Sequence, residues 1–224
     1  MCGILFFTGD ESLSIDHAAL ESIQHRGPDN VGVKHFKFKN KFITLGHRRL
    51  SIIELSDNGN QPMNYYSSDS WITFNGEIYN YKQLRADLIN NGYNFNTNSD
   101  TEVLLASYYH WGVDCLNYFN GMFSFVIWDN DQKKVFAARD RFGIKPMYYW
   151  NEKNGFGVAS EIKQLATLKG FKREINFEAA YQFLEYGDFS YNHETLWKNV
   201  FEIEPGSYFS IDYENWNLGE KFKI

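Results

Sequence analysis

Three features that this 224-residue chain has little of exclude whole classes of protein. It contains only two cysteines, Cys2 and Cys115, so it cannot carry a disulfide framework, and we expect both to be reduced thiols. Its longest apolar run, 123–128, is far shorter than the ~20 residues of a membrane-spanning helix. Its 22 Lys+Arg are outnumbered by 28 Asp+Glu, whereas nucleic-acid binding depends on clustered basic side chains. We therefore predict neither a membrane nor a nucleic-acid partner.

The first residues lack the features of an export signal. The segment 1–7 is apolar, but no basic leader precedes it, and Asp10 and Glu11 follow soon after it. We therefore expect a cytoplasmic protein. Aromatic residues are plentiful by contrast, with 20 Phe, 15 Tyr and 6 Trp, which predicts a sizeable core rather than a disordered chain.

Short runs rich in Phe, Tyr, Val and Ile, bounded by turn-forming residues, predict β-strands. They cover 4–8, 31–38, 42–45, 71–74, 123–128, 135–138, 147–150, 156–159 and 207–211. Helical periodicity predicts helices over 14–24, 81–91, 101–111, 161–168 and 177–186. Ser99 and Glu102 predict a capping box at the start of the third helix, with Asp100 in its first turn. Because the helices do not alternate with the strands, we predict an α+β layered domain.

Cys2 is the first candidate for chemistry. A cysteine taken at random is usually a small buried hydrophobic residue. Methionine before a small residue is normally removed, however, and its removal would leave a thiol and a free α-amine on the same residue. That amine has a reference pKa of about 7.7–8.0, so on the order of a tenth is free base at neutral pH and can act as a general base. If Met1 stays attached, the amine is locked in an amide and this base is lost.

Six motifs then occur in the order of a known family. Together they resemble the class II glutamine amidotransferase domain of the N-terminal nucleophile hydrolases. Two further segments, 139–149 and Glu204-Pro205-Gly206, narrow the resemblance to the glutamine-hydrolysing asparagine synthetase B type. The six motifs are Met1-Cys2-Gly3-Ile4, His25-Arg26-Gly27-Pro28-Asp29, His47-Arg48-Arg49-Leu50-Ser51-Ile52, Gln61-Pro62-Met63, Asn75-Gly76-Glu77-Ile78-Tyr79-Asn80 and Ser99-Asp100-Thr101-Glu102.

The resemblance implies a four-layer αββα sandwich that hydrolyses L-glutamine to L-glutamate and ammonia through a thioester on Cys2. Asn75 and Gly76 match the oxyanion hole of the family. Considered alone, Asn-Gly would be read as a hairpin turn, but the accompanying motifs favour the oxyanion hole. The implied reaction needs no cofactor in this domain, and no metal-ligand spacing or phosphate-binding loop is present in the sequence.

Free glutamine carries two charges that need partners. Arg49 matches the family residue that binds the α-carboxylate, although an exposed surface arginine is the commoner case for any single Arg. Arg48 would point to the opposite face of a strand. Asp100, and to a lesser degree Glu77, match the acids that bind the α-ammonium, and the alternative for Asp100 is a helix N-terminal charge. The same analogy adds contacts from Leu50, Ser51, Ile52 and Ile53.

Other segments receive structural interpretations. Arg26 and Asp29 would support the nucleophile from a flanking loop, or belong to an ordinary turn. We expect 141–146 to be a structural loop that joins two strands and faces a partner domain. Cys115 is expected to be buried and inert.

We expect a single glutaminase domain over 1–224, with a catalytic core at about 2–210. The Ser-Gly-Gly-Leu-Asp-Ser nucleotide loop of an ATP-dependent synthetase domain is absent from the chain, so ATP and Mg are expected only on such a domain, fused or separate, which would receive the ammonia. A homodimer is an open alternative. Asparagine is the expected final product. The alternatives are another acceptor, such as a sugar or a cell-surface saccharide acid, or a non-catalytic glutamine-binding scaffold.

Overall fold

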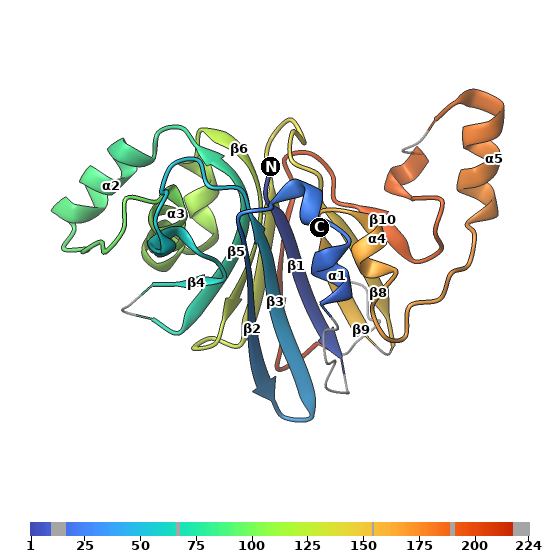
Figure 1. Ribbon diagram of the computed structural model, residues 1–224, viewed down its shortest axis with the longest axis horizontal. Helices are drawn as coiled ribbons and strands as arrows, with labels where there is room; N and C mark the ends of the chain where they lie inside the picture. The colour runs from blue at the N-terminus through green and yellow to red at the C-terminus, as the bar shows by residue number, and fades with distance from the viewer. Residues whose placement is uncertain (10–16, 66–67, 154, 189–190, 217–224) are drawn as a thin grey trace.

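The structure, a computed structural model, describes residues 1–9, 17–65, 68–153, 155–188 and 191–216. Within these ranges, two antiparallel β-sheets face each other, with helices over their outer faces (Figure 1). The first sheet has the order β10-β8-β9-β1-β3-β2 and contains β1 (Gly3–Gly9), β2 (Asn30–Phe38), β3 (Lys41–Arg49), β8 (Tyr148–Glu152), β9 (Gly155–Ala159) and β10 (Val200–Glu202). The second has the order β11-β7-β6-β5-β4 and contains β4 (Met63–Asn64), β5 (Ser70–Ile78), β6 (Gly121–Asp129), β7 (Lys134–Arg139) and β11 (Tyr208–Asp212).

The helices lie on the two outer sides of the sheet pair (Figure 1). The second sheet is covered by α2 (Tyr81–Asn90) and α3 (Asp100–Trp111), and the first by α1 (Ala18–Glu21) and α4 (Ile162–Leu165). Helix α5 (Phe177–Tyr186) lies at one end of the molecule. Short 3₁₀ turns cover Gln24–Arg26, Asp57–Gly59, Gly112–Asn117 and Tyr191–His193.

Strand alternation sorts the apolar side chains into three cores. Along β1, Ile4 and Phe6 pack between the two sheets, whereas Leu5 and Phe7 pack beneath α1 and α4. Trp128 of β6 joins the core between the sheets, and other side chains of the second sheet meet α2 and α3 in the third core. Successive side chains of a strand point to opposite faces, so each sheet is buried on both sides. The predicted four-layer αββα sandwich is confirmed.

All nine predicted strands are present, and the differences lie at the ends of elements. The very short β4 and β10 were not predicted. The helices predicted over 14–24 and 161–168 are shorter in the structure, at Ala18–Glu21 and Ile162–Leu165. The start of the first predicted range lies outside the described residues. Beyond Leu165 the chain tightens into turns with three-residue spacing, such as the Thr167 N–H to Gln164 carbonyl bond of 3.2 Å. Among the described residues, no helix is long and apolar enough to cross a membrane.

The start of α3 confirms only half of the predicted capping box. The Ser99 hydroxyl accepts a hydrogen bond from the Thr101 N–H at 3.1 Å, as an N-cap should. Glu102 does not return to Ser99, because its carboxylate accepts hydrogen bonds from the N–H groups of Asn96 (2.9 Å) and Thr97 (2.8 Å). The Glu102 side chain therefore caps the backbone of the loop before the helix instead of the Ser99 N–H.

Candidate active site

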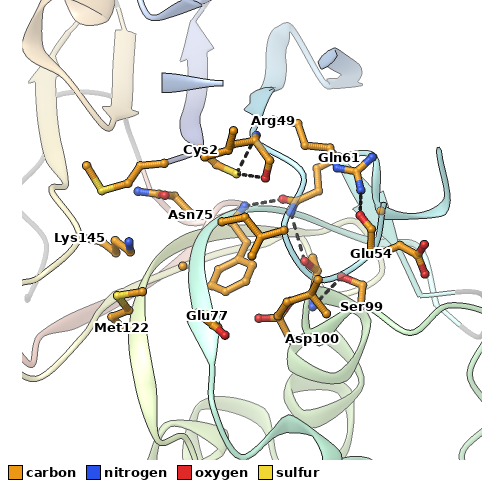
Figure 2. Close-up of a pocket in the computed structure, with 18 residues that line it drawn as sticks. Cys2, Arg49, Glu54, Gln61, Asn75, Glu77, Ser99, Asp100, Met122 and Lys145 are labelled. Carbon is orange, nitrogen blue, oxygen red and sulfur yellow. Dashed lines mark hydrogen bonds between the residues drawn. The ribbon is translucent and has the colours of Figure 1, made fainter. Parts of the chain in front are cut away.

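A cavity of about 260 Å³ opens where strands of both sheets end (Figure 2). Cys2 stands just before β1, and Arg49 is the last residue of β3, the neighbour of β1. In the second sheet, Asn75 and Gly76 lie near the end of β5, beside the start of β6. Antiparallel pairing places the start of one strand next to the end of its neighbour, so these residues converge. The cavity is smaller than the ~300–1,000 Å³ pockets of drug-sized ligands and suits a molecule of amino-acid size.

Most of the predicted site residues line this cavity. Those that do so are Cys2, Arg49, Leu50, Ile52, Ile53, Asn75, Gly76, Glu77 and Asp100. Three predicted residues lie behind the lining: Ser51, Arg26 and Asp29. The cavity is also lined by residues that the sequence did not single out, among them Glu54, Met122 and Lys145.

The Cys2 thiol lies against the backbone of Leu50. Its Sγ accepts a hydrogen bond from the Leu50 N–H at 3.3 Å and is 3.6 Å from the Leu50 carbonyl oxygen, to which the thiol can donate. Burial raises the pKa of the Cys2 thiol, although the Leu50 N–H, the terminal amine and the charges of Arg49 and Lys145 oppose this. The thiol is therefore protonated at neutral pH and needs a base before it can attack.

The free α-amine belongs to Met1, which also lines the cavity. Burial, together with the charges of Arg26 and Lys145, lowers the pKa of this amine. A lowered pKa increases the fraction of free base near neutral pH. Removal of Met1 would transfer a free amine to Cys2, next to its own thiol.

Asn75 and Gly76 lie inside β5, where they pair with Ser124 and Phe123 of β6. The hairpin-turn interpretation of Asn-Gly is therefore wrong. Asn75 is 1% exposed, and its Nδ2 amino group has no hydrogen-bond partner among the described residues. A buried donor without an acceptor costs about 1–3 kcal/mol, so this amide is available for an acceptor on a ligand. Only glycine fits at 76, because a Cβ there would lie 2.2 Å from the Met122 carbonyl oxygen.

Arg49 is buried rather than a surface arginine, which excludes the common alternative. Its Nη1 donates to the Ser56 carbonyl and to Asn60 Oδ1, both at 2.8 Å, and its Nη2 donates to the Glu54 carbonyl. A Cβ at Gly59 would lie 2.2 Å from Arg49 Nη2, so a larger residue there would displace the guanidinium. The Nε–H and one Nη2–H have no partner among the described residues. Arg48 faces the other way and donates to the Leu20 carbonyl at 3.0 Å.

Asp100 and Glu77 place two acids in the same cavity. Asp100 is 4% exposed and accepts a hydrogen bond from the Ile78 N–H at 3.0 Å. Burial raises the pKa of Asp100 to about 6, and the charge of Glu77 adds to this rise. A raised pKa in a buried acid means that its carboxylate lacks a cation, and a ligand ammonium would supply one. Asp100 is also the first residue of α3, so the alternative interpretation as a charge at a helix N-terminus is correct too.

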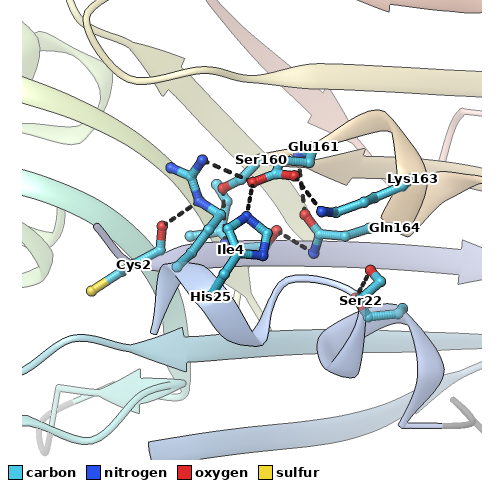
Figure 3. A network of polar contacts seen from close by, with 10 residues as sticks. Cys2, Ile4, Ser22, His25, Ser160, Glu161, Lys163 and Gln164 are labelled. Atoms are coloured by element: carbon cyan, nitrogen blue, oxygen red, sulfur yellow. Dashed lines mark hydrogen bonds and ion pairs between the residues drawn. The ribbon is translucent and has the colours of Figure 1, made fainter. Parts of the chain in front are cut away.

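The loop at 26–29 supports the site from behind. One of its partners is Glu161, which also contacts His25 and Lys163 (Figure 3). Arg26 is buried, and it donates from Nε to the Cys2 carbonyl at 2.9 Å and from Nη1 to Glu161 at 3.1 Å. Asp29 accepts a hydrogen bond from the Ser51 N–H at 2.8 Å and donates its own N–H to the Arg49 carbonyl at 3.1 Å. The loop therefore joins the nucleophile to the segment that carries the arginine.

Glu161 was not predicted as a support. Although burial raises its pKa, hydrogen bonds from Lys163, Arg26 and His25 hold the pKa of Glu161 below its usual value. The sequence signal for it is weak, because Glu161 is separated from Arg26 by 135 residues.

Gln61 lies in a recognised motif but had no assigned role. Its Oε1 accepts a hydrogen bond from the Phe74 N–H at 2.7 Å, and its Nε2 donates to the Thr101 hydroxyl at 3.2 Å. It therefore joins β5 to the start of α3, which carry the two sides of the cavity.

The segment 141–146 is a loop between β7 and β8, as predicted, but one of its residues reaches the cavity. Lys145 is 5% exposed and lines the wall near Met122 (Figure 2). Interpreting the whole segment as structural therefore missed this lysine. Cys115 is fully buried, as predicted, and burial raises the pKa of its thiol far above the usual value.

Solved structures of other proteins share this two-sheet architecture. Glutamine phosphoribosylpyrophosphate amidotransferase from B. subtilis covers 99% of this chain with 49% of its own, at a TM-score of 0.67 and 21% identity. A structure described as the allosteric regulatory enzyme of purine biosynthesis matches with the same coverage, at a TM-score of 0.68 and 22% identity. At these identities the likeness establishes the fold alone.

The sequence comparisons are more specific. The profile of the glutamine amidotransferase domain family matches residues 1–222. The chain is 44% identical over 191 residues to glutamine-hydrolyzing asparagine synthetase 1 of Bacillus subtilis (strain 168), covering 85% of this chain and 29% of that protein. It is 32% identical over 232 residues to asparagine synthetase 3 of the same organism, covering 100% of this chain and 37% of that protein. Amidase chry2 of Gibberella zeae is 34% identical over 222 residues, covering 93% of this chain and 32% of that protein.

The chain belongs to the glutamine amidotransferase domain family, which is a family of enzymes. It is homologous to glutamine-hydrolysing asparagine synthetases. It spans about a third of the length of these relatives.

Proposed function

We propose that this domain hydrolyses L-glutamine to L-glutamate and ammonia with Cys2 as the nucleophile. The observation that carries the proposal is the content of one cavity. It holds the Cys2 thiol, the unpartnered Asn75 Nδ2, the free N–H groups of Arg49 and the buried carboxyl of Asp100. These groups complement the amide, the α-carboxylate and the α-ammonium of a single glutamine molecule.

The first half of the reaction makes the thioester. With Met1 removed, the α-amine of Cys2 takes the thiol proton, and the thiolate attacks the side-chain amide carbon of glutamine. The oxygen that becomes negative accepts hydrogen bonds from Asn75 Nδ2 and the Gly76 N–H. When the tetrahedral intermediate collapses, the C–N bond breaks, the amine returns its proton to the leaving nitrogen, and ammonia departs.

The second half regenerates the enzyme. The free amine takes a proton from water, the resulting hydroxide attacks the thioester, and the same donors hold the new oxyanion. The C–S bond then breaks, the thiolate regains its proton, and glutamate leaves. Arg49 and Asp100 hold the α-carboxylate and α-ammonium throughout, so the reacting carbon stays beside Sγ.

For the whole protein, we propose that the ammonia amidates aspartate to asparagine on an ATP-dependent synthetase domain. Homology to several glutamine-hydrolysing asparagine synthetases supports this acceptor. ATP and Mg would belong to that domain, and residues 2 to about 210 would form the catalytic core of this one. A reducing cytoplasm suits the reactive thiol. The chain is also similar to an amidase that is not named as an asparagine synthetase. An ammonia acceptor other than aspartate is therefore the second candidate.

The decisive experiment compares ammonia release by the wild type with release by Cys2→Ala. We expect the variant to retain its fold and to lose all measurable glutaminase activity. Treatment of the wild type with an electrophilic glutamine analogue should add one adduct on Cys2 in the intact mass spectrum, in protein that lacks Met1. Undiminished ammonia release by Cys2→Ala would refute the mechanism. Glutamine binding by calorimetry without ammonia release from the wild type would indicate a scaffold instead.

A further inference from the structure

One charged group in the cavity has no part in the proposed reaction. Lys145 lies on the wall opposite Asp100, and its side chain points toward the space beside Asn75 and Met122 (Figure 2). It is 5% exposed, an unusual burial for a lysine. Among the described residues, its ammonium makes no hydrogen bond and no ion pair.

The backbone of Lys145 is fixed on both sides. Its N–H donates to Asp140 Oδ2 at 3.0 Å, and its carbonyl accepts from Arg139 Nε at 2.7 Å. The Asp140 carboxylate also accepts the N–H groups of Phe123, at 3.2 Å, and Ile144, at 3.0 Å. The loop is thereby joined to the start of β6, so the place from which the lysine side chain extends is set by the scaffold.

The stem of the Lys145 side chain is buried while its ammonium is open to the cavity, so an anion that forms in the cavity can pair with it. Burial lowers the pKa of the Lys145 ammonium, and the charge of Arg26 lowers it further. The opposing influences are anions, of which the Cys2 thiolate ranks first, before Asp140 and Glu77. In the resting site the thiol is neutral, so this attraction arises only once negative charge develops at Cys2. Interactions that strengthen during the reaction are those that accelerate it.

Resting on the glutaminase function proposed above, we infer that the Lys145 ammonium stabilises the negative charge that forms at Cys2 and on the tetrahedral intermediate. It adds an electrostatic component to the hydrogen bonds from Asn75 and Gly76. No bond to lysine forms or breaks.

The test measures the pH dependence of Cys2 alkylation by iodoacetamide, followed by intact mass, in the wild type, Lys145→Met and Lys145→Arg. The charged groups that line the cavity with Cys2 are the terminal amine, Arg49, Glu54, Glu77, Asp100 and Lys145, and Arg26 and Asp29 lie behind the lining. Only Lys145 changes in these variants. We expect the midpoint to move to higher pH in Lys145→Met and to return toward the wild-type value in Lys145→Arg. The matched control is Lys198→Met, which removes an exposed lysine paired with Glu174 and should leave the profile unchanged.

Steady-state kinetics supply the second readout. In Lys145→Met we expect kcat for glutamine hydrolysis to fall about 3- to 10-fold with KM little changed. The loss is smaller than the ~10²–10³ of an oxyanion-hole donor, because no hydrogen bond is removed. Lys145→Gln should behave in the same way and serves if Lys145→Met does not fold.

An unchanged alkylation midpoint in a folded neutral variant would overturn the inference. A raised KM at constant kcat would also overturn it, by making Lys145 a substrate-binding residue. The alkylation assay needs no turnover, so a wild type that fails to hydrolyse glutamine would refute the proposed function without deciding the role of Lys145.

Discussion

Two buried aspartates show how differently this molecule treats its scaffold and its cavity. Asp140, in the loop after β7, is 0% exposed and accepts hydrogen bonds from the backbone N–H groups of Phe123, Phe142, Ile144 and Lys145. Asp100, in the cavity, is 4% exposed and accepts a hydrogen bond from the Ile78 N–H of a neighbouring strand, and the N–H groups of Asp100 and Thr101 also favour its charged form. The first carboxylate is satisfied by the fold itself. The second has a pKa raised to about 6, mainly by burial, and is left to be satisfied by a ligand.

The same contrast extends to the other polar groups. Around the cavity, Asn75 Nδ2 has no partner among the described residues. Lys145 lines the same cavity, and its ammonium forms no hydrogen bond or ion pair with another described residue. Behind the cavity, Asp29 and Gln61 are engaged with backbone and side-chain partners. Arg26 is engaged through Nε and Nη1, and only its Nη2 has no partner among the described residues. Unpartnered buried polar atoms also occur away from the cavity lining, at His47, Ser124 and Trp128. Asn75 differs from them because it lines the cavity, where a ligand can supply the missing acceptor.

Among the substitutions that test this contrast between scaffold and cavity, we expect the largest effect from a change of Asn75. We expect Asn75→Ala to lower kcat about 10²–10³-fold, because one oxyanion donor is lost. Stability should change little, since the Nδ2 group makes no hydrogen bond with another described residue. Ammonia-release kinetics and thermal melting measure the two quantities.

Ser124 is the matched control for Asn75. It lies directly opposite in the β5–β6 pair, and its buried hydroxyl likewise has no partner among the described residues. We expect Ser124→Ala to alter kcat by less than about threefold, because no donor to the oxyanion is removed. A comparable loss of kcat in both variants would contradict the assignment of Asn75 as the donor.

The scaffold aspartate should show the opposite pattern. Asp140→Ala leaves several buried N–H groups without an acceptor, and we expect the free energy of unfolding to fall by about 3 kcal/mol, on the order of a 10²-fold change in the folding equilibrium. Urea denaturation at pH 7 measures it. A variant as stable as the wild type would show that the loop does not depend on this carboxylate.

Asp100 should give the smallest effect and the opposite sign. Its folded-state pKa is raised from 3.8 to about 6, so its contribution to stability is fully present below about pH 4 and is lost as pH rises through about 6. At pH 7 the ionised Asp100 carboxylate therefore destabilises the fold. We expect Asp100→Asn to raise the free energy of unfolding by roughly 1 kcal/mol and to weaken glutamine binding by about 10-fold or more.

Urea denaturation and calorimetry in a Cys2→Ala background measure these two changes. Glu102→Gln is the matched control, because Glu102 lies in the same helical turn and its carboxylate is hydrogen-bonded by Asn96 and Thr97. That substitution should destabilise. Destabilisation by Asp100→Asn would make Asp100 a scaffold residue like Asp140.

The strand boundaries show how far sequence patterns reach. The predicted strands 42–45 and 71–74 stop where polar residues begin, but β3 continues to Arg49 and β5 to Ile78. Apolar alternation ends at those positions, so propensity alone predicts a loop. Pairing with β1 and β6 extends both strands, because their backbone hydrogen bonds do not depend on the side chains. The extended ends carry Arg49, Asn75 and Gly76 into the cavity.

By itself, the sequence determined the sandwich fold, nearly all of its strands and most of the residues that line the cavity, because these depend on local periodicity and on motifs contiguous in the chain. Only the tertiary structure decided which polar groups are satisfied. Glu161 reaches Arg26, Asp29 holds Ser51, and Lys145 stands in the cavity beside Asn75. These contacts join residues that are far apart in sequence. Burial raises the pKa of Asp100 and leaves Asn75 Nδ2 without a partner, and burial arises only when the layers assemble.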